Sequence, residues 1–560
     1  MRPSRCLALS LCLYVYTSSP AADTIIRNGR IIDGTGADWF HGDIAITDGR
    51  ISAIGDLKDE KAPVELDAKD NIVAPGFIDV HTHADDDVFK LPLCENFIRD
   101  GVTTIVTGNC GSSTLQVGEY LARIKSDGVA VNVATLVGHN SVLTEVKGSK
   151  AGELTAEQRE AAHKIIARAM EEGAVGFSTG LIYTPGIYSN TQEIMDLNKV
   201  AGEYDGIYAT HMRNEASGVL DAIDEAISIA RAGGTRLEIS HFKLPKDVAP
   251  RIGGAQAMFA KANEARAQGL EVWIDQYPYT ASSTTLSVML PDWVRENGDK
   301  AGREMLADSG QISRVLADMR ESNEVKRGRK DLSYTVIASC KAIPEFTGYN
   351  IKQVAQIMKL RAEKGDAVDF KAIPQDQWPT VTMEDQYRAV IAIYVKGSAS
   401  CVYHTMDEHE VEDIMRSPLV SVCSDSGVRS FGVGVPHPRG YGSNARVLGK
   451  YVRERNVVPL SEAIRKMTSM PATAFRMKDR GLLREGCHAD IVVFDPATVT
   501  DKATFEAPHQ YSEGFSYVLV NGVVVNDHDT VTGKKPGEPI YGPGYKMAQA
   551  SQAATAPNAP

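Results

Sequence analysis

The stretch GFIDVHTH (residues 76–83) is the part of the sequence that says most about the fold. Its first half is a short apolar run of the kind that forms buried strands. His81 and His83 follow two residues apart, so on an extended backbone both imidazoles point to one side. We therefore predict a strand that presents two potential metal ligands at its carboxyl end.

Seven further apolar runs occur along the chain, and helical segments separate most of them. One such segment, residues 155–173, opens with a capping box formed by Thr155 and Gln158 and ends at Gly173. Alternating strands and helices are typical of parallel βα units, and eight units favour a closed (β/α)8 TIM-like barrel over an open sheet. The eight runs are residues 76–83, 102–108, 129–139, 174–179, 206–211, 236–242, 270–277 and 418–425.

The seventh and eighth runs are separated by about 140 residues, far more than a loop between neighbouring elements needs. We predict an inserted subdomain at about 285–400, before the last barrel strand, with an extra strand near residues 399–404. A segment of this size beside a substrate pocket can close over it as a lid.

Both ends of the chain alternate apolar and polar residues around tight-turn signals. Asn28-Gly29 and Asp48-Gly49 predict two hairpins within residues 24–54, and Asn521-Gly522 predicts another near the carboxyl end. A lone hairpin is only marginally stable, so we expect both ends to build one antiparallel sheet structure; two separate hairpins are the alternative. The predicted domains are therefore residues 23–75 and 480–540 from the two ends, and the barrel at 76–479.

The composition excludes several classes of protein. Of the 560 residues, 43% are hydrophobic, which is enough for a large core and excludes a disordered chain. The formal charge of -12 has the wrong sign for general binding to nucleic acid. An anionic substrate would need a few cations inside a cleft, because the field of the whole molecule would repel it.

Residues 1–22 are typical of a secretory signal peptide, with Arg2 and Arg5 before an apolar stretch and small residues before a cleavage site near Ala22. We expect a periplasmic or secreted protein without a membrane span, since the apolar stretch is far shorter than the ~20 residues that a span needs. Residues 541–560, rich in Ala, Gln, Ser and Pro towards their end, are expected to form a disordered tail. The cysteines are scattered and give no sign of a disulfide scaffold.

Residue types that bind metals recur at the ends of the predicted strands. His211 ends the fifth run, His241 the sixth and Asp425 the eighth, and Cys110 follows the second run in TGNCGSS. In a barrel these ends meet at one rim, so we expect the side chains to converge. Imidazoles, carboxylates and a thiolate favour a catalytic zinc site and hydrolysis. Taken alone, Cys110 is equally consistent with a small buried residue or half of a disulfide.

The same segments resemble a known family. DVHTHADDD, TGNCGSS, ATHMRNE, ISHFK, YPYTASS and CSDSG occur in this order, followed by MTSMPATAFRMKDRGLLREGCHADIVVFD. Together they are similar to the N-acyl-D-amino-acid deacylases (D-aminoacylases) of the amidohydrolase superfamily, over residues 24–530. The histidine pair and the final Asp are common to the superfamily, whereas the GNCG cysteine and the YPY and HPR segments are more specific to this branch.

The resemblance implies a metal-dependent barrel flanked by a small β-sandwich made from both termini. It implies that Cys110, His211 and His241 hold one tightly bound zinc ion, with the cysteine in place of the carboxylated lysine of many relatives. His81 and His83 would complete a second, weaker zinc site or shape the first. Asp425 would be the general base, and the same residue could also cap a helix.

The reaction that the resemblance implies is hydrolysis of the amide bond of an N-acyl-D-amino acid, a small molecule, to a carboxylate and a free D-amino acid. Asp425 would take a proton from the attacking water and return it to the leaving amine. Tyr279 competes with Tyr277 for a place in the site, since only one of them can face it from a strand. Hydrolysis of a D-dipeptide or a cyclic amide is one alternative, and a non-catalytic binding protein is another. The substrate α-carboxylate would contact Lys243, Tyr277, Ser283 and Arg439.

Overall fold

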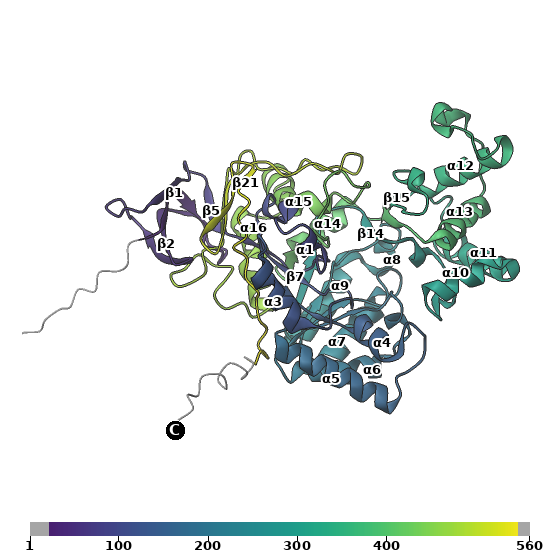
Figure 1. The fold of residues 1–560 in the computed structure, drawn as a ribbon, viewed down its shortest axis with the longest axis horizontal. Helices are drawn as coiled ribbons and strands as arrows, with labels where there is room; N and C mark the ends of the chain where they lie inside the picture. Colours follow the sequence, from purple (N-terminus) through teal and green to yellow (C-terminus); the bar gives the residue numbers. More distant parts are fainter. Residues whose placement is uncertain (1–21, 547–560) are drawn as a thin grey trace, which may run out of the picture.

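The computed structural model describes residues 22–546, so the expected signal peptide at residues 1–22 lies outside the described residues except for Ala22. Figure 1 shows three parts: a sheet built from both chain ends, a central α/β body, and a projecting insert that carries α10 to α13. None of the helices within residues 22–546 is long and apolar enough to cross a membrane.

The central body contains a strand in each of the eight apolar runs, and every pairing between these strands is parallel. Their residues are almost all buried, as expected for parallel strands covered on both faces. The strands are β6 (Phe77–Asp79), β7 (Val102–Thr107), β8 (Asn132–Thr135), β9 (Val137–Gly138), β10 (Gly176–Gly180), β11 (Ile207–His211), β12 (Arg236–Ile239), β13 (Val272–Gln276) and β17 (Val420–Val422).

The strand pairings fall into two groups, β6-β7-β8 and β9-β10-β11-β12-β13-β17. Only Leu136 separates β8 from β9 along the chain. Just beyond β6 and β17, Asp425 N–H donates to the His81 carbonyl at 2.9 Å, and His83 N–H donates to the Ser426 carbonyl at 2.9 Å. Backbone hydrogen bonds therefore join the segment after β6, which carries His81 and His83, to the segment after β17, which carries Asp425.

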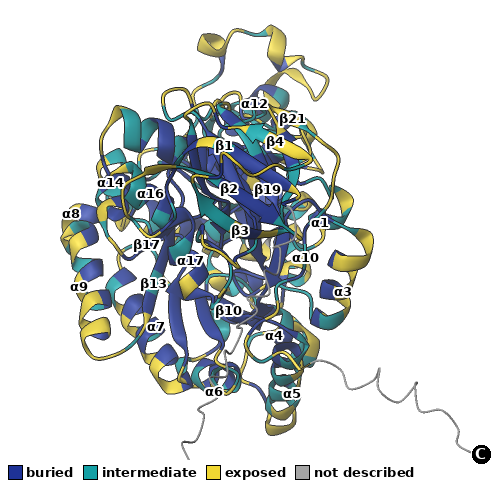
Figure 2. Cartoon of the chain, turned by 90° about the vertical axis from the view of Figure 1, so that its left-hand side faces the viewer, coloured by how far each residue is buried: buried dark blue, intermediate teal, exposed yellow. Residues whose placement is uncertain are grey.

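Helices surround these strands, with buried inner faces and exposed outer faces (Figure 2). The predicted capping box is present at the start of α5, where Thr155 and Gln158 exchange hydrogen bonds, and Gly173 ends the helix at φ 116°. The main helices are α3 (Val117–Asp127), α4 (His139–Lys147), α5 (Ala156–Glu172), α6 (Thr191–Gly202), α7 (Val219–Gly233), α9 (Gly254–Ala267), α14 (Glu408–Arg416) and α16 (Leu460–Met467).

The two chain ends share one nine-stranded sheet, because β5 pairs with β18 in antiparallel register. The alternative of two separate hairpins is thereby excluded. The sheet is not wholly antiparallel, since β1 pairs in parallel with both β4 and β5. Its strands are β1 (Thr24–Ile31), β2 (Phe40–Thr47), β3 (Arg50–Gly55), β4 (Val64–Asp67), β5 (Ile72–Pro75), β18 (Ile491–Phe494), β19 (Phe515–Val520), β20 (Val523–Asp527) and β21 (Thr530–Val531).

The prediction of a hairpin turn at Asn28-Gly29 is wrong. These residues lie inside β1 as a bulge, where the register with β2 shifts. A two-residue type I′ turn needs positive φ at both positions, and here only Asn28 has it (56°). The bulge divides β1 into a half that pairs with β4 and a half that pairs with β5. Asp48-Gly49 and Asn521-Gly522, with positive φ at all four residues, do join hairpins.

The insert has its own apolar core and a three-stranded antiparallel sheet in the order β14-β16-β15. The predicted extra strand near residues 399–404 is β16. Its elements are β14 (Ser282–Thr285), α10 (Asp299–Ala307), α11 (Ile312–Arg320), β15 (Thr335–Ser339), α12 (Ile351–Lys364), α13 (Met383–Lys396) and β16 (Ser400–Tyr403).

The disordered tail does not begin at residue 541 as expected. Gly542 N–H donates to the Gly173 carbonyl, and Lys546 N–H donates to the Glu171 carbonyl, both at 2.9 Å. The rings of Tyr541 and Tyr545 stack with centroids 4.0 Å apart. Residues 541–546 thus pack on the end of α5, and the rest of the expected tail lies outside the described residues.

Candidate metal centre

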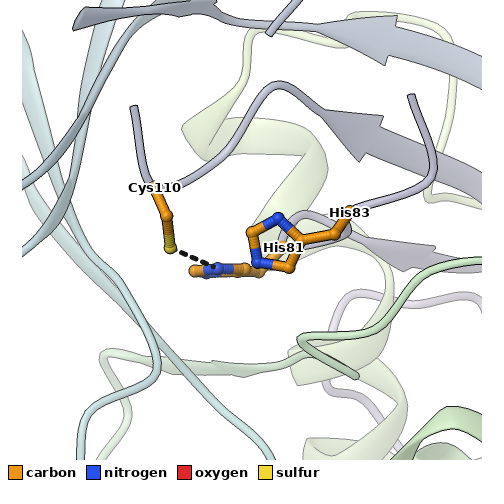
Figure 3. A group of neighbouring side chains, drawn as sticks. All are labelled: His81, His83 and Cys110. Carbon is orange, nitrogen blue, oxygen red and sulfur yellow. Dashed lines mark hydrogen bonds between the residues drawn. The ribbon is translucent and has the colours of Figure 1, made fainter. Parts of the chain in front are cut away.

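The predicted ligands come together at the carboxyl ends of the parallel strands. Figure 3 shows Cys110 beside His81, with His83 next to it. The Cys110 sulfur lies 3.3 Å from His81 Nε2, 3.7 Å from His211 Nδ1 and 3.6 Å from His241 Nε2. Cys110 is a free thiol, so the alternative of a disulfide half does not hold.

The donor set Cys110, His211 and His241 fits a tetrahedral zinc ion. Zinc lies about 2.3 Å from sulfur and about 2.0–2.1 Å from nitrogen, which in a tetrahedron separates sulfur and nitrogen by about 3.5 Å. The two observed sulfur–nitrogen distances, 3.7 and 3.6 Å, agree. The two imidazole nitrogens are 2.8 Å apart, closer than the about 3.3 Å that a tetrahedral zinc ion requires, so the imidazoles must separate slightly to hold it. All three residues are buried.

A second donor set lies against the first. His83 Nε2 is 3.2 Å and His81 Nε2 is 3.6 Å from Asp425 Oδ1. His81, His241 and Asp425 also form a possible three-ligand group, as do His81, His83 and Cys110. Because Cys110 and His241 of the first set also belong to these groups, the side chains form one continuous cluster and not two separate sites.

The backbone at this cluster is strained. Cys110, His241 and Asp425 have φ values of 53°, 38° and 49°, in the left-handed region that residues with side chains rarely adopt. Such conformations persist where the surroundings enforce them, and they concentrate at functional sites. Each of these residues lies two or three positions beyond the end of a strand, in a turn that aims its side chain into the cluster.

Charge keeps the two acidic groups of the cluster ionised. Burial alone would raise the pKa of the Cys110 thiol, but His81 and hydrogen bonds from His211 and His241 outweigh it and lower the pKa well below its usual value. Burial would also raise the pKa of Asp425, but Arg439 and then His81 lower it well below the ordinary range. A thiolate and a carboxylate are the forms that a ligand and a general base require.

Two further acidic residues, which we did not anticipate from the sequence, support the cluster from outside. Asp275 accepts a hydrogen bond from His241 N–H at 2.6 Å and lies 3.4 Å from His81 Nδ1. Glu215 contacts the outer nitrogens of His211 and His241. The sequence did place both residues near the predicted ligands. Asp275 lies in the seventh apolar run, and Glu215 lies in HMRNE, four residues after His211.

The residues expected to bind the substrate carboxylate line the same cavity, which has a volume of about 580 Å³. Both cations have carboxylate partners: Lys243 lies 2.7 Å from Glu215, and Arg439 lies 2.7 Å from Asp425. The Arg439 guanidinium stacks 4.5 Å from the ring centroid of the third residue, Tyr277. The fourth, Ser283, lies on β14.

The choice between Tyr277 and Tyr279 is resolved by what each ring contacts. Tyr277 lines the cavity together with Lys243 and Arg439. Tyr279 packs instead against Arg446, at 4.6 Å, and against Phe505. Tyr277 is therefore the tyrosine of the YPY segment that faces the site.

A second cavity, of about 450 Å³, opens between the central body and the insert. It shares Glu215, Lys243 and Thr284 with the first cavity, so the two are adjoining chambers. Its wall includes apolar residues of the insert such as Met289 and Met319. The insert thus borders the space beside the metal cluster, where a lid was predicted.

A thiolate, imidazoles and an ionised carboxylate gathered at the ends of parallel strands define a metal-dependent hydrolase. The amidohydrolase family model matches residues 64–526. The chain belongs to the amidohydrolase family.

Two characterised relatives and two solved structures are similar to nearly the whole chain. A D-aminoacylase of Alcaligenes xylosoxydans xylosoxydans is 32% identical over 93% of this chain and 98% of its own length. An N-acyl-D-glutamate deacylase of the same organism is 33% identical over 90% and 93%. The structure of N-acyl-D-glutamate deacylase from Bordetella bronchiseptica, with zinc and a phosphonate mimic of the tetrahedral intermediate, has a TM-score of 0.75 and 33% identity, covering 93% of this chain and all of that one. A D-aminoacylase structure has a TM-score of 0.76 and 31% identity, with the same coverage.

Proposed function

We propose that the protein hydrolyses the amide bond of N-acyl-D-amino acids and that its metal is zinc. The observation that carries the proposal is the convergence of the Cys110 sulfur with His211, His241 and the base Asp425. The similarity to D-aminoacylases over nearly the full chain supports the substrate class, and the zinc complex of the deacylase relative supports the metal.

Cys110, His211 and His241 would hold the tightly bound ion, and His81 and His83 would complete a weaker second site or shape the first. Zinc, when bound, supplies a Lewis acid that polarises a carbonyl and acidifies water. A solved D-aminoacylase structure that is similar to this chain, with a TM-score of 0.75, is described as having a binuclear metal centre. This similarity supports a site that can hold two ions.

The side chains of the cavity divide the remaining work. Asp425, held ionised, takes a proton from the attacking water and delivers it to the leaving amine, which cannot depart as an anion. Lys243, Tyr277, Ser283 and Arg439 bind the α-carboxylate. Because Arg439 is paired with Asp425, substrate binding exchanges this ion pair for one with the substrate and leaves the base free to act.

The experiment is an activity screen of the zinc-loaded protein. N-acetyl-D-amino acids should be cleaved, and their L enantiomers, D-dipeptides and cyclic amides should be poor substrates. The variant Asp425→Asn, which keeps the shape of the side chain and removes the base, should lose about 100-fold or more in kcat. Unchanged cleavage by Asp425→Asn would reject the base assignment, and preference for dipeptides or cyclic amides would reject the substrate class.

We also infer that the eight parallel strand segments close into a barrel and that the chain is exported to the periplasm. The hydrogen bonds that tie the ends of β6 and β17 support closure. The composition of residues 1–22 supports export. Amino-terminal sequencing of protein from the periplasmic fraction should begin near Asp23, and recovery of an uncleaved chain from the cytoplasm alone would contradict export.

A further inference from the structure

Glu215 occupies a position where one carboxylate meets three groups of the site. It lies in the segment between β11 and α7, and 16% of its side chain is exposed. Oε1 lies 3.0 Å from His241 Nδ1 and 2.7 Å from Lys243 Nζ. Oε2 lies 3.4 Å from His211 Nε2.

The two histidines use opposite nitrogens towards the metal cluster. His211 directs Nδ1 at the Cys110 sulfur, and His241 directs Nε2 at it. A carboxylate can only accept hydrogen bonds, so it favours a proton on the ring nitrogen that faces it. In a neutral imidazole the other nitrogen then presents its lone pair. Glu215 therefore favours the metal-binding tautomer of both histidines, closely at His241 (3.0 Å) and from a longer contact at His211 (3.4 Å), where no hydrogen bond forms within residues 22–546.

No other acidic side chain among residues 22–546 lies within 4.0 Å of either outer nitrogen. Asp275 contacts the backbone of His241 and the ring of His81, and so supports a different part of the cluster. The orientation of both ligand imidazoles thus depends on a single carboxylate.

The same carboxylate also reaches the substrate side of the cavity. Its Oε1 accepts a hydrogen bond from Lys243, one of the cations assigned to the substrate carboxylate. With the proton on His241 Nδ1, this nitrogen and Lys243 Nζ both donate to Glu215 Oε1, and Lys243 Nζ also donates to the His241 carbonyl oxygen at 3.2 Å.

We propose that Glu215 is a positioning residue that fixes the metal-facing nitrogens of His211 and His241 and, through Lys243, couples metal binding to recognition of the substrate carboxylate. The coupling to substrate rests on the proposed function, whereas the effect on the metal does not.

The test uses the full-length holoenzyme and Glu215→Gln. The glutamine amide has one oxygen acceptor and one NH2 donor, whereas the carboxylate has two acceptors. The NH2 group therefore faces either His211 or His241, and that imidazole loses its acceptor. Loss of a residue that orients metal-bound histidines typically costs about 10–100-fold in metal affinity. We expect a loss of about that size for zinc in competition with a chelator. The absorption bands of the cobalt-substituted protein should also shift.

Two matched variants make the result specific. Glu225→Gln alters a glutamate of similar burial that pairs with Arg213 and touches no ligand, so zinc affinity should stay within about twofold. Glu215→Asp retains both acceptors and should recover part of the affinity lost in Glu215→Gln. If Glu215→Gln does not fold, the zinc affinity of Glu215→Asp is compared with that of the wild type instead.

Coupling is measured by a double-mutant cycle of KM with Glu215→Gln and Lys243→Met. Non-additive effects on KM are expected, because the two residues share a hydrogen bond. Zinc affinity and cobalt spectra that match the wild type would overturn the metal role, and strictly additive KM values would overturn the coupling. Metal binding is measured without substrate, so it still decides the inference if N-acyl-D-amino acids prove not to be cleaved.

Discussion

Three residues at the metal cluster combine a strained backbone conformation with a side chain that can bind a metal or a proton. The left-handed backbones of Cys110, His241 and Asp425 place a thiol, an imidazole and a carboxylate within reach of each other. Only the packed surroundings can hold such conformations, because each costs free energy in an isolated chain. The folded protein therefore uses part of its stability to keep the site in an arrangement suited to binding a cation.

A buried histidine away from the cluster should make the protein sensitive to acid. Burial lowers the pKa of His139 to about 3, and neither ring nitrogen has a hydrogen-bond partner among residues 22–546. The unfolded chain takes up this proton near pH 6.5 and the folded protein does not, so this part of the stability is complete above pH 6.5 and is lost as the pH falls.

The variant His139→Leu removes that proton uptake. Relative to wild type, its free energy of unfolding in urea should rise by about 2 kcal/mol between pH 7.5 and pH 5. A constant difference between His139→Leu and wild type across this range would contradict the assignment.

The convergence of the candidate metal ligands could be predicted from the sequence, but the residues that support them could not. Each candidate ligand lies at the end of a strand or two to four residues beyond it, so the convergence follows from the fold; these ligands are His81, His83, Cys110, His211 and His241. Acidic residues are common on any surface, and nothing in the local sequence of Glu215 says that its carboxylate folds back onto two imidazoles. That contact depends on the path of the chain between β11 and α7.

At the scale of elements, the Cys110 turn depends on how closely neighbouring strands approach it. A Cβ on Gly180, at the end of β10, would lie 2.1 Å from the Cys110 carbonyl oxygen. That separation is far inside van der Waals contact, so the turn that carries the thiolate can occupy its position only beside a glycine.

Gly180→Ala should therefore displace the Cys110 turn. We expect weaker zinc binding and a lower melting temperature, measured by chelator competition and by calorimetry. Gly310→Ala, at an exposed glycine with open space around it, is the matched control and should change neither. Unaltered zinc affinity in Gly180→Ala would mean that the turn adjusts without moving the sulfur.

Strand positions were more predictable than their connections. Each of the eight apolar runs contains a strand of the central body, because burial on both faces leaves a continuous apolar sequence. The Asn-Gly pair at residues 28–29 looks locally like the pair at 521–522, yet one is a bulge and the other a hairpin turn. The difference arises from β4 and β5, which continue the pairing on both sides of the bulge and lie elsewhere in the sequence.

Over the whole molecule, the insert and the central body together enclose the space next to the metal cluster. The position of the insert could be predicted from the unusual gap between two runs, but its fold could not, because its mixed helices and strands have no repeating pattern. The cavity of about 450 Å³ between the two parts has Met289 in its wall and adjoins the site through Lys243. We expect one arm of an extended substrate to enter it.

Met289→Trp should shrink that cavity and change selectivity. Substrates with a large acyl group or a large side chain should lose about tenfold or more in kcat/KM relative to N-acetyl-D-alanine, because a filled apolar pocket excludes them. Varying the acyl group and the side chain separately identifies the arm that enters. Met289→Leu is the conservative control, and an equal loss for all substrates would contradict a role in selectivity.

The pairing of β5 with β18 has a consequence for biogenesis. Most of the polypeptide must be synthesised before β5, at residues 72–75, can pair with β18, at residues 491–494. Until then the early strands expose an unpaired edge, which is prone to association with other chains. Truncated translation products of this protein should therefore be recognised by chaperones or degraded and should not accumulate as half-active fragments.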